Sequence, residues 1–151
     1  MKSINYDNIK IKDLENIAKE IASKIFESKK ESFVIYLEGN MGAGKTTLAQ
    51  NIGKELGVKD HMQSPTFTLM REYDLPSEIN FESNNYKKLI HIDAYRFENK
   101  KEGHVLRINE NKLNNIVLIE WQSNMQAPDS DMIINIEKVS EEVRNIKIEI
   151  I

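Results

Sequence analysis

Residues 39 to 47 read GNMGAGKTT, and this stretch constrains the fold of the chain more than any other. It fits the pattern G-x-x-x-x-G-K-[ST], with Gly39, Gly44, Lys45 and Thr46 at the fixed positions. Glycines let a backbone wrap closely around phosphate groups with its N–H groups turned inward, where a Cβ would obstruct the approach. The lysine adds a mobile positive charge, and the threonine hydroxyl suits a Mg²⁺ ion between the β- and γ-phosphates. The pattern predicts a phosphate-binding P-loop for a nucleoside triphosphate.

The sequence on both sides of the loop supports this interpretation. An apolar run with β-branched and aromatic residues, 33 to 37, precedes the loop and is typical of a buried parallel strand. Apolar residues at helical spacing follow the loop: Leu48, Ala49, Ile52 and Leu56. Gly57 comes where such a helix would end. The alternative, a glycine-rich turn that only links a strand to a helix, explains neither the lysine nor the threonine.

Length and composition limit the remaining possibilities. The 151 residues are 40% hydrophobic and 30% charged, which is typical of a soluble globular protein, and we expect a single P-loop domain over residues 1–151. The net charge is −3 and the basic residues form no dense block, so we expect no strong autonomous binding of nucleic acid. Disulfides and cysteine zinc sites are excluded because cysteine is absent. No long apolar run or N-terminal signal pattern occurs, which predicts a cytoplasmic protein without a membrane role.

Periodicity predicts further elements in the first two thirds of the chain. Residues 11 to 28 carry an apolar stripe of period near 3.6 and should form an amphipathic helix. Thr66 to Tyr73 is expected to be extended, and Asp74 to Tyr86 to be a surface loop. The runs 89–93 and 116–120 are each four apolar or near-apolar residues followed by a carboxylate, which predicts two core strands.

The C-terminal third has a different pattern. Apolar and polar residues alternate over 132–136 and 146–150, which predicts two strands with one wet face each. Joined by the polar stretch 138–143, they should form an antiparallel hairpin. Residues 97 to 114 are polar without a clear period and leave room for a short helix. The predicted fold is an α/β P-loop NTPase with three layers and a mostly parallel central sheet that ends in this hairpin.

Asp93 and Glu120 are the candidate acidic partners of the P-loop. Each ends a predicted core strand, and the carboxyl ends of parallel strands meet at one edge of a sheet. A P-loop needs such a carboxylate for Mg²⁺. One of the two could hold the metal while the other orients a water molecule, and the residues alone leave both assignments open. Either could also be an ordinary carboxylate at the end of a strand.

Hydroxyl groups precede the first of these strands. Ser64, Thr66 and Thr68 lie between the P-loop helix and the Asp93 strand, where switch loops commonly supply a hydroxyl to the metal or the γ-phosphate. The threonines could equally be strand residues. Trp121, directly after Glu120, could stack on a base, line a partner surface or simply pack.

The three histidines show no metal or triad spacing. They are His61, His91 and His104, and we assign none of them a role. His91 lies within an apolar strand and is interpreted as a satisfied structural histidine.

Four segments together resemble one known family. LEGNMGAGKTT at 37–47, SPTFTL at 64–69, HIDAYR at 91–96 and IEWQ at 119–122 occur in the order and at similar spacing to those of TsaE, the YjeE family. This family comprises small bacterial P-loop ATPases of tRNA threonylcarbamoyladenosine (t6A37) synthesis. The resemblance covers most of residues 11–151, and the last three segments are far more specific than a P-loop alone.

The resemblance implies roles for individual residues. It implies that Thr46 and Glu120 bind Mg²⁺ and that Asp93 assists hydrolysis of ATP. It also implies two sets of nucleotide contacts: Gly42, Ala43, Gly44, Lys45, Thr46 and Thr47 at the triphosphate, and Trp121, Ser123 and Arg144 close to the nucleotide.

The same resemblance implies partners. Members of the family act with TsaD and TsaB, the proteins that form the modification enzyme, and their ATP turnover resets or activates that complex. Contact with tRNA would then be indirect, in agreement with the acidic composition. Two segments depart from the family: Asp13-Leu14 stands where an acidic residue followed by threonine is common, and residues 98–114 match poorly.

Three rival functions remain. A small-molecule kinase would need an acceptor pocket and usually an arginine-bearing lid, whereas the four arginines are scattered along the chain. A GTP-binding switch protein would carry D-x-x-G and N-K-x-D, and neither signature is complete. A nucleotide-bound scaffold with negligible turnover is compatible with the same residues.

Overall fold

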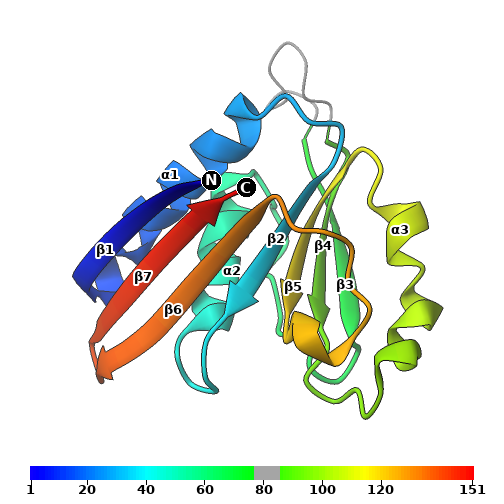
Figure 1. The fold of residues 1–151 in the computed structure, drawn as a ribbon. Coiled ribbons are helices and arrows are strands. Elements are labelled where there is room, and N and C mark those ends of the chain that lie inside the picture. Colours follow the sequence, from blue (N-terminus) through cyan, green and yellow to red (C-terminus); the bar gives the residue numbers. More distant parts are fainter. Residues whose placement is uncertain (77–85) are drawn as a thin grey trace.

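The protein is built around one twisted sheet, which the computed structural model describes within residues 1–76 and 86–151. Seven strands of this described part form the sheet in the order β1-β7-β6-β2-β5-β4-β3 (Figure 1). The strands are β1 (Lys2–Lys10), β2 (Phe33–Glu38), β3 (Met70–Asp74), β4 (Lys88–Asp93), β5 (Asn115–Glu120), β6 (Met132–Ser140) and β7 (Val143–Ile150). The α-helices are α1 (Leu14–Glu27), α2 (Lys45–Glu55) and α3 (Ile108–Asn111).

The centre of the sheet is parallel, as the sequence predicts. Strand β2 pairs in parallel with both β5 and β6, and β5 pairs in parallel with β4. Antiparallel pairs extend both ends, with β7 on β6, β1 on β7 and β3 on β4. The register of β4 and β5 sets Asp93 opposite Glu120, so both carboxylates stand at the same edge of the sheet.

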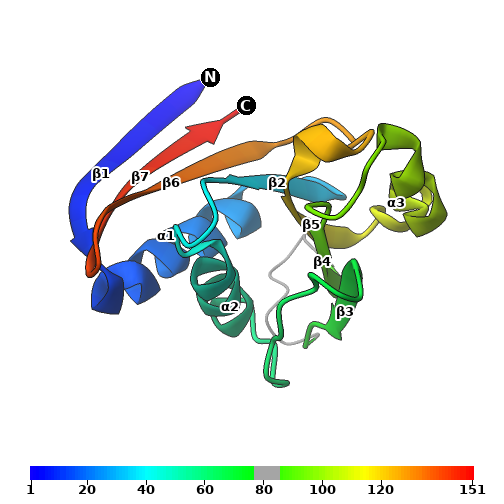
Figure 2. The same ribbon diagram turned by 90° about the horizontal axis from the view of Figure 1, so that it is seen from below.

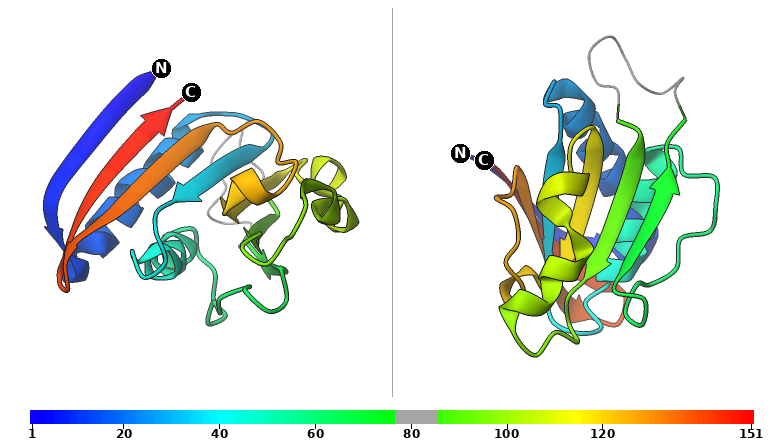
Figure 3. Two further views of the ribbon diagram at one scale, coloured as in Figure 1. Left: turned by 60° about the horizontal axis from the view of Figure 1, so that its bottom comes forward. Right: turned by 90° about the vertical axis from the view of Figure 1, so that its right-hand side faces the viewer.

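Helical segments cover the two faces of the sheet and give three layers. One face packs Ile35, Leu118 and their neighbours against α1 and α2. The opposite face of the central strands packs Val34 and Val117 against the segment that contains α3. Figure 2 shows α1 and α2 inside the curve of the sheet, and Figure 3 shows α3 over the other side. The predicted three-layer α/β architecture is confirmed.

The N-terminal strand β1 is an element that the sequence analysis did not predict. It pairs with β7 and has a register shift between Tyr6 and Ile9, where Asn8 adopts a φ of 56°. Asparagine tolerates this left-handed conformation better than most residues. Tyr6 and Ile9 lie against the core on the α1 side. The irregularity breaks the period-2 pattern that would have revealed the strand.

The helix expected at 11–28 is confirmed as α1, which is preceded by a 3-10 turn, Ile11–Asp13.

The extended segment expected from Thr66 to Tyr73 is wrong in its first half. Residues 66–69 form a turn, in which the Leu69 N–H donates to the Pro65 carbonyl at 2.6 Å and Leu69 has a φ of 68°. Regular pairing begins only at Met70. A turn at this point redirects the chain, so the two threonines leave the sheet and are not strand residues.

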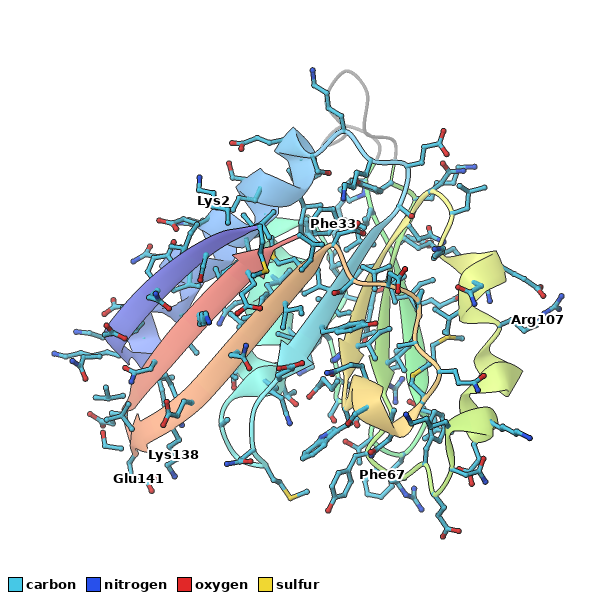
Figure 4. The ribbon with its side chains drawn as sticks, viewed as in Figure 1. Lys2, Phe33, Phe67, Arg107, Lys138 and Glu141 are labelled. Carbon is cyan, nitrogen blue, oxygen red and sulfur yellow. The ribbon has the colours of Figure 1, made fainter. Side chains whose placement is uncertain are left out.

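The C-terminal hairpin is confirmed, but its strands are longer than predicted. Ladder pairing continues to Ser140 opposite Val143, so most of the expected polar connection is strand. Backbone hydrogen bonds hold this part without an apolar face. Lys138 and Glu141 form a salt bridge of 2.8 Å at the tip (Figure 4).

Three remaining expectations concern loops and spans. The sequence analysis left room for a short helix within 97–114, and this stretch contains α3 and a 3-10 helix, Lys100–Leu106. Most of the predicted loop 74–86 lies outside the described residues. In the described ranges, no helix is long and apolar enough to cross a membrane.

Candidate nucleotide site

The P-loop connects the end of β2 to the start of α2. Gly42 and Gly44 have φ values of 80° and 107°, in the left-handed region that other residues rarely adopt. At Gly39 a Cβ would lie 2.5 Å from the Ile136 carbonyl oxygen of β6, so only glycine fits beside that strand. Helix α2 begins at Lys45, and its first N–H groups have no partner within the helix. Unpaired N–H groups and the helix dipole together favour an anion here.

A cavity of about 420 Å³ lies over this loop. Its walls come from the P-loop, from the ends of β4 and β5, from the hairpin and from the start of α1. The lining residues are Ile11, Leu14, Met41, Gly42, Gly44, Lys45, Thr46, Thr47, Thr66, Asp93, Tyr95, Glu120, Trp121 and Arg144. Most of the residues that the sequence predicts for the site therefore share one cavity.

Four of the predicted site residues do not line the cavity. Ala43 is buried behind the loop, where its carbonyl accepts a hydrogen bond from Arg144. Ser64 does not line the cavity, but its hydroxyl lies 2.7 Å from that of Thr66, which does. Thr68 and Ser123 are exposed.

Asp93 is held by two donors at the end of β4. Its Oδ1 accepts the Tyr95 N–H and its Oδ2 accepts the Thr66 hydroxyl, both at 2.9 Å. The side chain is 6% exposed. The contact with Thr66 links the turn at 66–69 to a carboxylate that lines the cavity.

Glu120 makes a different contact, with a residue to which the sequence analysis assigned no role. The Nε2 atom of His91 lies 2.6 Å from Glu120 Oε2, and both side chains are buried. Within the described residues, Nδ1 of His91 has no hydrogen-bond partner. His91 is buried and hydrogen-bonded, as expected of a structural histidine, but only one of its two ring nitrogens has a partner among the described residues. Its spacing of two residues from Asp93 was the available signal, because residues i and i+2 of a strand share a face.

Lys45 lies across the cavity, close to the two carboxylates. Its Nζ donates to the Gly39 carbonyl at 2.5 Å and lies 4.0 Å from the centroid of the Trp121 ring. Burial lowers the pKa of Lys45, and the charges of Glu120 and Asp93 act in the opposite direction. A cation above an aromatic face is stabilised by the ring quadrupole. Lys45 is thus kept near the expected phosphate position.

Arg144 fastens the P-loop to the hairpin. Its Nε donates to the Ala43 carbonyl at 2.6 Å, and its Nη1 donates to the Ser140 and Val143 carbonyls at 2.6 and 3.0 Å. The side chain is 5% exposed. Arg144 lines the cavity, but these donors bind backbone carbonyls. The side chain therefore holds the P-loop against the hairpin.

The segment after β5 also reaches the P-loop. Trp121 has a φ of 58°, and its ring centroid lies 5.0 Å from that of Tyr95. Gln122 donates to Glu38, the last residue of β2, at 2.6 Å. Of the cavity-lining residues, the sequence analysis did not assign Tyr95, Met41, Ile11 and Leu14 to the site. The quoted segments HIDAYR and LEGNMGAGKTT contain the first two, so membership of a motif was the usable signal for them.

Comparison with known proteins decides the family. The family model described as "Threonylcarbamoyl adenosine biosynthesis protein TsaE" matches residues 10–146. This chain belongs to the TsaE family. The resemblance found in the four sequence segments is thereby confirmed.

Curated TsaE proteins align over most of the chain. The protein of Haemophilus influenzae is 32% identical over 85% of this chain and 76% of its own length. The Aquifex aeolicus protein is 34% identical over 85% and 86%, and that of Bacillus subtilis 30% over 97% and 85%. All three are named tRNA threonylcarbamoyladenosine biosynthesis protein TsaE.

A solved structure shares the fold. The crystal structure of Bacillus subtilis YdiB superposes with a TM-score of 0.64, covering 97% of this chain and 84% of that chain at 24% identity. The mixed α/β sheet with a parallel centre is therefore a fold that this chain shares with that protein.

The donor set of the cavity fits Mg²⁺. Thr46 offers a hydroxyl, and Asp93 and Glu120 offer carboxylates. Mg²⁺ prefers oxygen ligands and is usually held by one or two carboxylates together with substrate phosphates and water. No cluster of three or more His, Asp or Glu side chains suited to a metal occurs in the described part of the chain. A metal here would thus need oxygen ligands from a bound triphosphate in addition to the protein side chains.

Proposed function

We propose that this protein is the Mg²⁺-dependent ATPase subunit of a cytoplasmic system that forms threonylcarbamoyladenosine (t6A37) in tRNA. The observation that carries the proposal is the convergence of the P-loop, Asp93 and Glu120 on one cavity of about 420 Å³. Membership of the TsaE family supplies the biological context, because its curated members are named for this biosynthesis. The cavity supports ATP as the ligand through its phosphate-binding loop.

In this proposal the P-loop positions the triphosphate and spreads its charge. The N–H groups at the start of α2 and the Lys45 ammonium face the phosphates. Phosphoryl transfer needs little covalent help from a protein, so preorganised positive charge and orientation supply most of the catalysis. The Lys45 ammonium has three donors, of which the Gly39 carbonyl takes one, so others are left for a phosphate beside the Trp121 ring.

The two carboxylates take separate tasks. Thr46 and Glu120 would hold Mg²⁺, which when bound neutralises charge on the β- and γ-phosphates. Asp93 would orient the attacking water, and its contacts with Thr66 and Tyr95 favour a fixed carboxylate for this purpose. The opposite assignment, with Asp93 on the metal, uses the same atoms.

TsaD and TsaB are the proposed partners. In this scheme ATP turnover resets or activates their complex, and another subunit holds the tRNA. The net charge of −3 supports indirect contact with RNA, because a protein that binds RNA by itself usually carries a basic face.

A kinase or a nucleotide-bound scaffold is the alternative. Of the four arginines, only Arg144 lines the cavity among the described residues, and its Nε and Nη1 donate to backbone carbonyls. This observation argues against an arginine-rich acceptor site.

The test is Mg²⁺-dependent hydrolysis of ATP, with GTP in parallel, by the protein alone and mixed with TsaD and TsaB of the same source. We expect ATP turnover that the partners stimulate, and its loss in Lys45→Ala. Lys54→Ala, at an exposed position of the same helix, should behave like the wild type. Turnover unaffected by Lys45→Ala would refute the site, and nucleotide binding without any response to the partners would favour a kinase or scaffold.

A further inference from the structure

The buried contact between His91 and Glu120 has no part in the scheme above. His91 lies in the middle of β4 and is 1% exposed, and Glu120 at the end of β5 is 2% exposed. Nε2 of His91 and Oε2 of Glu120 lie 2.6 Å apart, which is a short hydrogen-bond distance. Both side chains are buried and contact each other directly, so each restricts the orientation of the other.

Metal binding by Glu120 fixes the direction of this hydrogen bond. A carboxylate that holds a metal is ionised and can only accept hydrogen bonds, so in that state His91 Nε2 is the donor. Nδ1 is then an acceptor, and it has no donor within the described residues. With Oε2 engaged by His91, Oε1 is the Glu120 oxygen left for the cavity that this residue lines.

Asp93 is immobilised in another way. A backbone N–H and the Thr66 hydroxyl hold its two oxygens. Glu120 has one more rotatable bond than an aspartate, and no backbone donor contacts its carboxylate in the described part of the chain. The orientation of Glu120 therefore depends on the imidazole of the neighbouring strand.

We propose that His91 is a positioning residue, whose Nε2–H holds the Glu120 carboxylate in the orientation that binds Mg²⁺. This inference rests on the proposed function, since it needs Glu120 to be a metal ligand. Groups that orient a metal ligand by hydrogen bonds typically change metal affinity by about 10- to 100-fold when they are removed. Removing one partner of a buried pair is strongly destabilising, so metal and nucleotide affinities are compared only among variants that fold. Within the described residues His91 makes no hydrogen bond to the P-loop, so the effect should appear at the metal and not in the nucleotide contact.

The test compares three substitutions of His91. In His91→Gln the amide nitrogen falls near the position of Nε2 and keeps the donor. In His91→Asn the amide is one methylene shorter and falls near Nδ1, so it does not reach Glu120. His91→Leu removes the donor altogether. The Gln and Asn variants form a matched pair of equal polarity, which keeps the test decisive if the leucine variant does not fold.

Two affinities are measured on each purified full-length variant. Mn²⁺ binding to the complex with ADP, followed by electron paramagnetic resonance, reports the metal. ADP binding in EDTA, followed by Trp121 fluorescence, reports the nucleotide alone. We expect His91→Asn and His91→Leu to weaken Mn²⁺ binding by about 10-fold or more, His91→Gln to stay within about 3-fold of wild type, and ADP binding in EDTA to be unchanged. Added to Glu120→Gln, His91→Leu should cause no further loss of metal affinity.

The outcomes separate the two proposals. Equal Mn²⁺ affinity in wild type and His91→Asn, or equal losses in the Gln and Asn variants, would overturn the positioning role alone. If the wild type binds ADP but no Mn²⁺, the proposed Mg²⁺-dependent function fails and the role of His91 fails with it.

Discussion

The hydrogen bond between Thr66 and Asp93 is the contact by which the turn after α2 reaches the site. Thr66→Val keeps the shape of the side chain and removes the hydroxyl. Asp93 then loses one of its two donors, and a hydrogen bond to a charged group contributes about 1.5–3 kcal/mol. We expect kcat for ATP to fall by about 10- to 100-fold, with ADP affinity nearly unchanged because the P-loop is untouched. Steady-state turnover and calorimetric titration measure the two quantities.

Thr68→Val is the matched control for this prediction. Thr68 is exposed and does not line the cavity, so its substitution should leave turnover at the wild-type level. Equal losses in the two variants would mean that the whole turn acts as a unit and that the Asp93 contact is not the cause.

Some residues of the site can be identified from a pattern in the sequence, and others only from the folded structure. Lys45 and Thr46 belong to a pattern with fixed spacing, and Asp93 and Glu120 each end an apolar run, so sequence alone could select them. His91 could not be assigned in this way. Its role depends on the register that sets β4 beside β5, and register is a property of the folded sheet.

At the scale of elements, the hairpin β6–β7 supports the P-loop through Arg144. Arg144→Met preserves much of the apolar stem but leaves the Ala43 and Ser140 carbonyls without their donors. Buried acceptors without partners cost about 1–3 kcal/mol each. We expect the free energy of unfolding to fall by about 2 kcal/mol and ATP affinity to weaken as well, because the loop loses its brace. Chemical denaturation and calorimetric titration provide the measurements.

Lys147→Met, on the same strand, serves as the control for Arg144. Lys147 is exposed, and surface pairs such as its salt bridge with Glu149 contribute little. A loss of ATP affinity without loss of stability in Arg144→Met would contradict the bracing role and indicate direct contact with the nucleotide.

Element prediction succeeded where burial is continuous and failed at the edges of the sheet. Strands β2, β4 and β5 are apolar on both faces, so composition alone marks them. Strand β1 is largely exposed, as is the end of β6 over residues 137–140, and backbone pairing holds both. The pattern of side chains in a sequence gives little information about strands that are held by backbone hydrogen bonds.

At the scale of the whole molecule, one sheet edge gathers the site from segments far apart in the chain. The P-loop, the turn at 66–69 and the ends of β4 and β5 meet at the end of the sheet that carries the labelled Phe67 in Figure 4. Phe67 is 85% exposed there, with the Arg96 guanidinium 5.4 Å from its ring centroid. A ligand in the cavity would touch several of these segments and should therefore stabilise the fold as a unit.

Thermal unfolding tests this coupling between the site and the whole fold. A ligand at 100 times its Kd stabilises the native state by about 2.7 kcal/mol, which corresponds to a rise in Tm of about 5 to 10 °C for a chain of this length. We expect such a rise with ADP and Mg²⁺, and a smaller one when EDTA removes the metal, because the P-loop contacts persist while the Thr46 and Glu120 contacts are lost. Lys45→Ala should show almost no rise, since the cation that meets the phosphates is gone. A rise of the same size in wild type and Lys45→Ala would place nucleotide binding outside this cavity. If EDTA leaves the Tm of the wild-type complex unchanged, the site does not bind a metal.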